Sequence, residues 1–161
     1  MRKFVLLLVI VFSMVLISGC TDINDEFKKE VESTNSIIIS NFDKWVESAI
    51  SEDYIGVVSS ASFMNRDAKE GRERILAITN TNETIKNEYL SALRTVEDAS
   101  YTLSNLNAGA LLATSNTKSS FNKIGADLRE GMDGIIEVQS IWDESIMNTY
   151  QDKISQIQKN L

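Results

Sequence analysis

The chain has 161 residues, with 16 basic and 23 acidic side chains and a net charge of −7. It contains no histidine, no proline and a single cysteine, which excludes Ser-His-Asp and Cys-His catalysis, histidine zinc sites and an internal disulfide. The acidic balance, without a run of basic residues, argues against nucleic-acid binding. We therefore expect no cofactor, no metal site and no nucleic-acid partner.

The first element in the chain is an apolar segment that follows two basic residues. It extends from Phe4 to Gly19, and a helix of sixteen residues would be about 24 Å long. The hydrocarbon core of a bilayer is about 30 Å thick, so this segment is short for a membrane span. Its length is typical of a secretory signal peptide.

The end of this segment, Ile17-Ser18-Gly19-Cys20, resembles the lipobox of prokaryotic lipoproteins. There an aliphatic residue and two small residues, which let a peptidase close around the backbone, precede a cysteine that accepts a lipid. The resemblance covers residues 1–20. It implies removal of 1–19 as a signal peptide, lipid (diacylglyceryl and palmitate) on Cys20, and a short tether over 20–24. The alternative is an uncleaved anchor with an incidental cysteine.

Residues 25–161 are expected to form one helical domain. After cleavage the chain keeps 14 basic and all 23 acidic residues, a side-chain charge of −9. Proline is absent, so it interrupts no long helix, and apolar residues recur at steps of three and four, the spacing of a helix face. The periodicity therefore predicts an all-α domain.

The first two predicted helices are joined by the polar residues Ser51-Glu52-Asp53, which are suited to start a helix. The first helix spans about Asp25 to Ile50. The second spans Tyr54 to Ile78 and is lined with small residues. The inner stripe of the first helix is predicted to consist of Phe27, Val31, Thr34, Ile38, Phe42, Trp45 and Ala49.

The third predicted helix has its apolar stripe from Ile85 to Ala113, where nine apolar or alanine positions follow alternate steps of four and three. A turn near 79–81 makes the second and third helices an antiparallel hairpin. Asn80 is expected to cap the third helix while Glu83 reaches back. Alanine along the stripe lets a neighbouring helix approach closely.

The last predicted helix runs from about Ser119 to the end, after the polar run 114–118. Three glycines, at positions 125, 131 and 134, weaken it, and we expect close packing there with a bend at 131–134. The four helices together predict an antiparallel up-down-up-down four-helix bundle with coiled-coil-like seams.

One apolar stripe lies beside the inner face of the first helix and is a candidate partner contact. It consists of Ile39, Val46 and Ile50, at steps of seven and four. Two interpretations are open. Both stripes are buried if the helix covers three positions in seven, whereas Ile39, Val46 and Ile50 form a docking ridge if they stay partly exposed.

Other motifs are expected to be structural. Trp45 and Trp142 fall on inner stripes and are predicted to pack in the core. Asn82-Glu83-Thr84 fits a glycosylation sequon but lies where a helix cap is expected. The charged run 70–74 predicts a solvated face with local ion pairs. The three carboxylates Asp127, Glu130 and Asp133 predict a solvated acidic face in preference to a cation site.

The functional expectation is a lipid-anchored helical bundle on the outer face of a cytoplasmic membrane or in the cell envelope. It binds another protein or builds envelope structure. The first alternative is a ligand-capturing bundle that works with a separate receptor or transporter, and it resembles, in architecture alone, the sensor domain of chemotaxis-type receptors. A ligand binder needs a cavity with convergent polar groups. An enzyme that uses only carboxylates is the least favoured reading.

Overall fold

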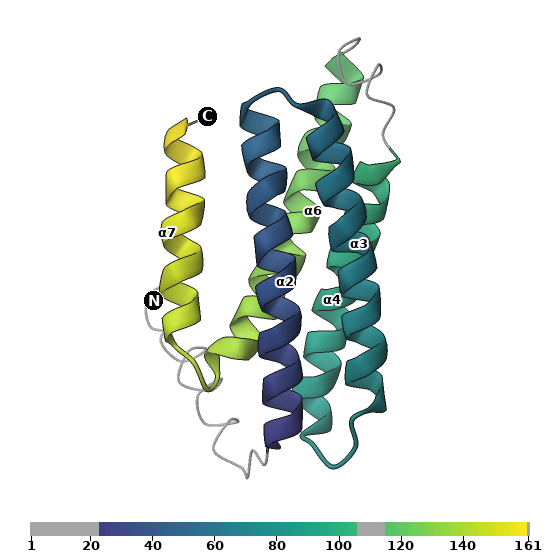
Figure 1. Ribbon diagram of the computed structural model, residues 1–161, viewed down its shortest axis with the longest axis vertical. Coiled ribbons are helices and arrows are strands. Elements are labelled where there is room, and N and C mark those ends of the chain that lie inside the picture. The colour runs from purple at the N-terminus through teal and green to yellow at the C-terminus, as the bar shows by residue number, and fades with distance from the viewer. Residues whose placement is uncertain (1–22, 106–114, 161) are drawn as a thin grey trace, which may run out of the picture.

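The computed structural model describes residues 23–105 and 115–160. Every regular element within these residues is a helix: α2 (Asp25–Ile50), α3 (Tyr54–Ala77), α4 (Glu83–Ser104), α6 (Ser115–Ser140) and α7 (Ser145–Asn160). Helices α2, α3, α4 and α6 alternate in direction, and α6 descends behind α2 and α3 (Figure 1). The predicted all-α antiparallel bundle is confirmed. No helix in the described part of the chain is long and apolar enough to cross a bilayer.

Side chains of asparagine and aspartate determine where the helices begin. The Asn24 Oδ1 atom accepts the N–H of Phe27 at 2.7 Å and caps α2. The Asn24 amide also donates to the carbonyls of Thr79 (3.2 Å) and Asn80 (3.3 Å), so one side chain joins the start of α2 to the α3–α4 turn. Asp53 caps α3 through the N–H of Gly56 at 3.0 Å.

The cap of α4 differs from the prediction. Asn82, and not Asn80, accepts the N–H groups of Thr84 (3.0 Å) and Ile85 (3.1 Å), so α4 begins at Glu83. Asn80 lies in the turn with φ 60, in the left-handed region that asparagine tolerates better than most residues. Asn82, the asparagine of the sequon Asn82-Glu83-Thr84, is therefore the N-terminal cap of α4. The predicted continuation of this helix over 106–113 lies outside the described residues.

The core is built from the buried faces of α2, α3, α4 and α6, and it includes most of the predicted inner stripe of α2. Extensive packing joins α2 to α3, α3 to α4, and α4 to α6. Phe27 meets Tyr89 edge-on at 6.1 Å and Trp142 at 6.3 Å, while Phe42 stacks on Trp45 at 5.9 Å. Both tryptophans are partly buried against the core, as predicted. The largest fully buried side chains include Tyr89, Phe27, Ile38, Met64, Ile75, Leu93, Leu128 and Ile135.

Glycines let α6 approach α4 closely. A Cβ atom at position 131 would lie 2.8 Å from the backbone nitrogen of Val96, and one at position 134 would lie 2.8 Å from the Cβ of Ala92. The predicted close packing is therefore correct. Helix α6 continues unbroken from Ser115 to Ser140, so the glycines do not interrupt it, and the bend at 131–134 stays a prediction. Its first turn includes most of the polar run that was expected to precede the helix.

Helix α6 ends at Ser140, and residues 141–144 form a turn. The sequence had predicted one last helix that continues through this segment. The indole N–H of Trp142 donates to Glu32 at 2.9 Å, and its ring packs on Phe27. This contact turns the chain back toward α2. Asp143 then accepts the N–H (3.2 Å) and the hydroxyl (2.5 Å) of Ser145 and starts α7. The described residues thus contain a fifth helix, α7, which contacts α6 and stands to the left of α2 in Figure 1.

The charged run 70–74 forms the predicted local ion pair, Arg74 with Glu70 at 4.0 Å, and it also connects helices. Arg72 pairs with Glu97 of α4 at 2.9 Å, and Arg74 pairs with Glu30 of α2. These half-exposed pairs contribute at most about 1 kcal/mol each to stability. Their effect is to fix α3 relative to both of its neighbours.

Buried hydrogen bonds link three helices and extend to the start of α7. The Tyr89 hydroxyl of α4 donates to Asn35 Oδ1 of α2 at 2.8 Å. The Asn35 amide donates to the carbonyl of Ile135 and to Gln139 Oε1 of α6, each at 2.9 Å. The Gln139 amide in turn contacts Asp143 at 3.4 Å. The residue that caps α7 is therefore connected to the bundle core.

Alanine substitutions at two glycines of α6 are expected to change stability in opposite directions. Gly131→Ala should destabilise the protein by about 1–3 kcal/mol, because the added methyl meets the α4 backbone. Gly125→Ala should stabilise it by about 0.5–1 kcal/mol, because nothing lies within 4 Å and alanine favours helix. Thermal or urea unfolding measures both. Equal effects of the two substitutions would contradict the close approach of α6 to α4.

High pH is expected to weaken the protein through Tyr89. Burial raises the pKa of the Tyr89 hydroxyl well above its ordinary value of 10.0. The stabilisation that Tyr89 contributes is complete below the pKa of this hydroxyl in the unfolded chain, near 10. It is lost as the pH rises toward the higher pKa of the hydroxyl in the folded protein. Tyr89→Phe should cost about 1–2 kcal/mol at pH 7, where the bond to Asn35 is lost. The difference from the parent should shrink above pH 10, as measured by unfolding at a series of pH values.

The exposed Tyr101→Phe is the matched control for this series. It should leave the stability at pH 7 unchanged. Parallel pH curves for the parent and Tyr89→Phe would show that Tyr89 ionises equally easily in both states.

Candidate functional site

The residues predicted for partner contact do not form a continuous exposed ridge. Val46 is 7% exposed and belongs to the core, Ile39 is partly buried against the core, and Ile50 is 41% exposed. Residues seven apart share a helix face, and Glu32, seven before Ile39, contacts Trp142. This face of α2 therefore looks toward the α6–α7 turn. A partner contact at Ile39 and Ile50 stays a prediction.

The exposed member of the isoleucine run is Ile37, at 44%, while Ile38 is fully buried. Ile37 lies at a groove between α2 and α3, opposite Phe63 of α3, which is 47% exposed. The groove has a volume of about 480 Å³. Its lining consists of Ser36, Ile37, Ser40, Asn41, Lys44, Phe63, Arg66 and Asp67.

A buried polar contact fixes the floor of this groove. Asp67 Oδ2 accepts a hydrogen bond from the Asn41 amide at 2.7 Å. Asp67 Oδ1 accepts two bonds from the Arg66 guanidinium, at 3.0 and 2.8 Å. These bonds raise the pKa of Arg66, whose guanidinium also lies 5.2 Å from the centre of the Phe63 ring. Because a buried carboxylate without partners costs several kcal/mol, this arrangement is held in place.

The groove combines apolar edges with a positive charge. Ile37 and Phe63 supply exposed apolar surface, and Lys44 and Arg66 outnumber the single carboxylate of Asp67. The protein as a whole is acidic. The groove is therefore suited to a partner that inserts an apolar side chain and presents an acidic group to Lys44.

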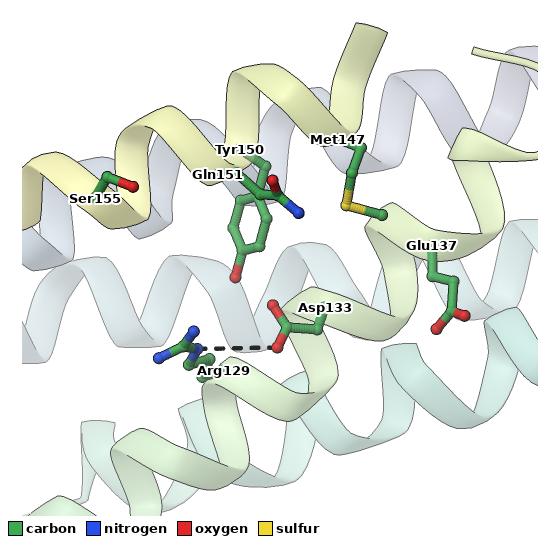
Figure 2. A pocket seen from close by; sticks show the side chains of 7 residues that line it. All are labelled: Arg129, Asp133, Glu137, Met147, Tyr150, Gln151 and Ser155. Atoms are coloured by element: carbon green, nitrogen blue, oxygen red, sulfur yellow. Dashed lines mark ion pairs between the residues drawn. The ribbon is translucent and has the colours of Figure 1, made fainter. Parts of the chain in front are cut away.

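A second hollow lies between α6 and α7 (Figure 2). Its volume is about 430 Å³. The residues that line it are Arg129, Asp133, Glu137, Met147, Tyr150, Gln151 and Ser155. The hydrogen bonds from Asn35 through Gln139 to Asp143 place the start of α7, and with it this hollow, relative to the bundle.

Three acidic residues of α6 are exposed, as predicted: Asp127, Glu130 and Asp133. Asp133 pairs with Arg129 at 3.8 Å. Within residues 23–105 and 115–160, no group of three or more histidine, cysteine, aspartate or glutamate side chains is arranged to hold a metal ion. Cys20, the predicted site of lipid attachment, lies outside the described residues.

Sequence patterns missed the groove residues for identifiable reasons. The apolar spacing on the first helix selects Ile39 in place of Ile37, because Ile39 continues the row with Val46 and Ile50. The run of three isoleucines, Ile37–Ile39, is the only sequence signal that one of them points outward. Phe63 lies next to the buried Met64 and outside the buried face of α3. An aromatic residue off the stripe was therefore the available signal on α3.

Comparisons with known proteins leave the function to be inferred from these surfaces. No protein-family model, no curated protein and no solved structure matches the chain.

Proposed function

We propose that this protein is a lipid-anchored, extracytoplasmic helical bundle that binds another protein through the groove between α2 and α3. The lipobox resemblance at Cys20 supports the anchor and a location at the cell membrane or in the envelope. The observation that carries the binding role is the pair Ile37 and Phe63, two large apolar side chains exposed across one groove. A single exposed apolar residue is common on protein surfaces. Two that line the same groove, beside the hydrogen-bonded Asp67, form a contact surface for a partner.

The position of the groove suits a partner near the membrane. Helix α2 begins at Asp25, five residues after Cys20, so a lipid on this cysteine keeps the bundle close to the bilayer. Ile37 lies twelve residues into α2, about 18 Å along its axis from the tether end. Another protein that extends a similar distance from the same membrane would therefore reach Ile37 and the groove.

The packing of the bundle favours protein binding over capture of a ligand in the bundle core. Glycine and alanine bring α6 against α4 with no room for a methyl group at Gly131. A binder that holds its ligand between the helices needs a cavity there, with convergent polar groups. The hollow between α6 and α7 lies outside this core and is the one observation that favours the ligand-binding alternative.

Removal of both apolar edges should abolish partner binding without unfolding the protein. Ile37→Ser together with Phe63→Ser removes two side chains that are a little less than half exposed, so we expect a loss of stability of about 1–3 kcal/mol and a protein that stays folded. Crosslinking in native membranes, followed by identification of the products, should show the partner with the parent protein and not with this variant.

The matched control is Ile55→Ser together with Leu76→Ser. Both residues lie on α3 and are exposed, Ile55 at 80%, and neither lines the groove. The control should keep the crosslinked partner. If the groove variant keeps the partner, or if both variants lose it equally, the groove is not the contact surface.

Substitution of the predicted lipid-bearing residue tests the anchor separately. Cys20→Ala removes the thiol that accepts the lipid, so an unprocessed precursor should accumulate without incorporated lipid. Labelling of cells with a fatty-acid analogue and the electrophoretic mobility of the protein measure both effects. Thr21→Ala, the control, should be processed normally. Normal cleavage and anchoring of Cys20→Ala would exclude the lipoprotein reading.

A further inference from the structure

The hollow between α6 and α7 is bordered by two facing rows of side chains (Figure 2). Residues 129, 133 and 137 follow one another at successive turns of α6, and residues 147, 151 and 155 do the same on α7. The helices are antiparallel, so Arg129 lies toward Ser155 while Glu137 lies toward Met147 (Figure 2). The hollow therefore has a cationic end at Arg129 and an anionic end at Glu137.

The charges in this hollow are only loosely paired with one another. The Arg129 Nε atom lies 3.8 Å from Asp133 Oδ2, which is too long for a hydrogen bond. Both side chains are about half exposed. The guanidinium thus keeps free donors, and the carboxylates of Asp133 and Glu137 keep free acceptors, on the walls of one hollow.

Tyr150 supplies a buried polar group that is aimed into the hollow. The residue is 4% exposed, and its hydroxyl is shielded from water without a hydrogen-bond partner among the described residues. The hydroxyl points toward Arg129 and Asp133 (Figure 2). Burial, followed by the charge of Asp133 and by the approach of that carboxylate as a hydrogen-bond acceptor, raises the pKa of Tyr150. Among the described residues no acceptor lies within hydrogen-bonding distance, so the protonated hydroxyl can donate to a ligand. A buried donor without an acceptor is unfavourable.

These groups complement a ligand that carries both charges. A carboxylate beside Arg129 accepts from the guanidinium and from the Tyr150 hydroxyl. An ammonium group beside Asp133 and Glu137 pairs with their carboxylates. We propose that the hollow between α6 and α7 binds a small zwitterion, such as a short peptide, with its carboxylate at Arg129 and Tyr150 and its ammonium at Asp133 and Glu137.

The spacing along α6 indicates the size of this zwitterion. Arg129 and Asp133 are one turn apart, a rise of about 6 Å, and Arg129 and Glu137 are two turns apart, a rise of about 12 Å. A dipeptide places its two charges roughly one helical turn apart. The volume of about 430 Å³ lies within the range of small-molecule sites. Asp133, about half exposed, has room to rotate and admit the ligand to the Tyr150 hydroxyl.

This site goes beyond the proposed function, because it requires neither the lipid nor a protein partner. A ligand bound to both rows would also hold α7 against α6, so binding should raise the melting temperature of the protein. The full chain, purified in detergent, can therefore be tested directly.

The probes are glycine, diglycine, triglycine and tetraglycine, which differ only in the separation of the two charges. Thermal unfolding and isothermal titration calorimetry should show binding, strongest for a short member of the series. N-acetyl-diglycine, which lacks the ammonium, and diglycine amide, which lacks the carboxylate, should each bind at least tenfold more weakly. The absence of binding by all four peptides, or equal binding by the blocked forms, would overturn the proposal.

Substitutions assign the two ends of the ligand. Arg129→Gln and Tyr150→Phe should each weaken binding of the preferred peptide about tenfold. Arg94→Gln is the matched control, because Arg94 pairs with Asp98 at 3.9 Å with the same spacing on α4 and lines neither hollow. It should leave binding unchanged. Unchanged binding by Arg129→Gln would overturn the proposal.

A second measurement addresses the hydroxyl itself, independently of any ligand. If the Tyr150 hydroxyl has no partner in the free protein, Tyr150→Phe should melt no lower than the parent. If Asp133 instead rotates and accepts the hydroxyl, Tyr150→Phe should melt lower and should bind the peptides as the parent does. That second result would show that the hydroxyl is satisfied within the protein, and it would overturn the proposal.

Discussion

The hydrogen bonds of Asn35 join α2 to α6, two helices that contact each other only sparsely. Packing is extensive between α2 and α3, α3 and α4, and α4 and α6, but sparse between α2 and α6. The fully buried Asn35 amide accepts from Tyr89 and donates to Ile135 and Gln139. A buried amide with these partners favours one register of α2 against α6, because any sliding leaves polar groups without partners. The positions of the α6–α7 turn, and therefore of α7, follow from this register.

The two surface hollows are fixed by different means, and this difference suits different ligands. The floor of the α2–α3 groove is closed by Asp67, whose oxygens are occupied by Asn41 and Arg66. A partner can therefore contact the exposed apolar side chains of the groove, Ile37 and Phe63, and the charge of Lys44. In the α6–α7 hollow the charged groups are not used up by internal bonds, so polar contacts remain available there. The first surface is suited to a protein side chain and the second to a small charged molecule.

Periodicity predicted the helices well because each one buries a single face, and a 3.6-residue repeat records that face directly. The bounds of α2 and the start of α3 followed from cap residues next to the apolar stripes.

Tertiary contacts determine the features that the sequence did not predict. Asn80 and Asn82 are equally able to cap a helix, and only the path of the α3–α4 turn distinguishes them. The break after Ser140 depends on Trp142 packing against Phe27, more than a hundred residues away. The exposure of Ile37 in place of Ile39 depends on which neighbours cover α2, and the hollow at Tyr150 exists only because the chain turns back at 141–144.

The contacts of Asn24 would have a mechanical consequence if a lipid on Cys20 held the chain at its N-terminal end, as proposed. A force applied through the preceding residues reaches Asn24 before it reaches α2. The same side chain caps α2 and holds the carbonyls of Thr79 and Asn80. Tension is therefore divided between the first helix and the α3–α4 hairpin, and it loads these hydrogen bonds together. A bundle attached in this way would resist unravelling from its first turn and would transmit a pull to α2 and to the α3–α4 hairpin together.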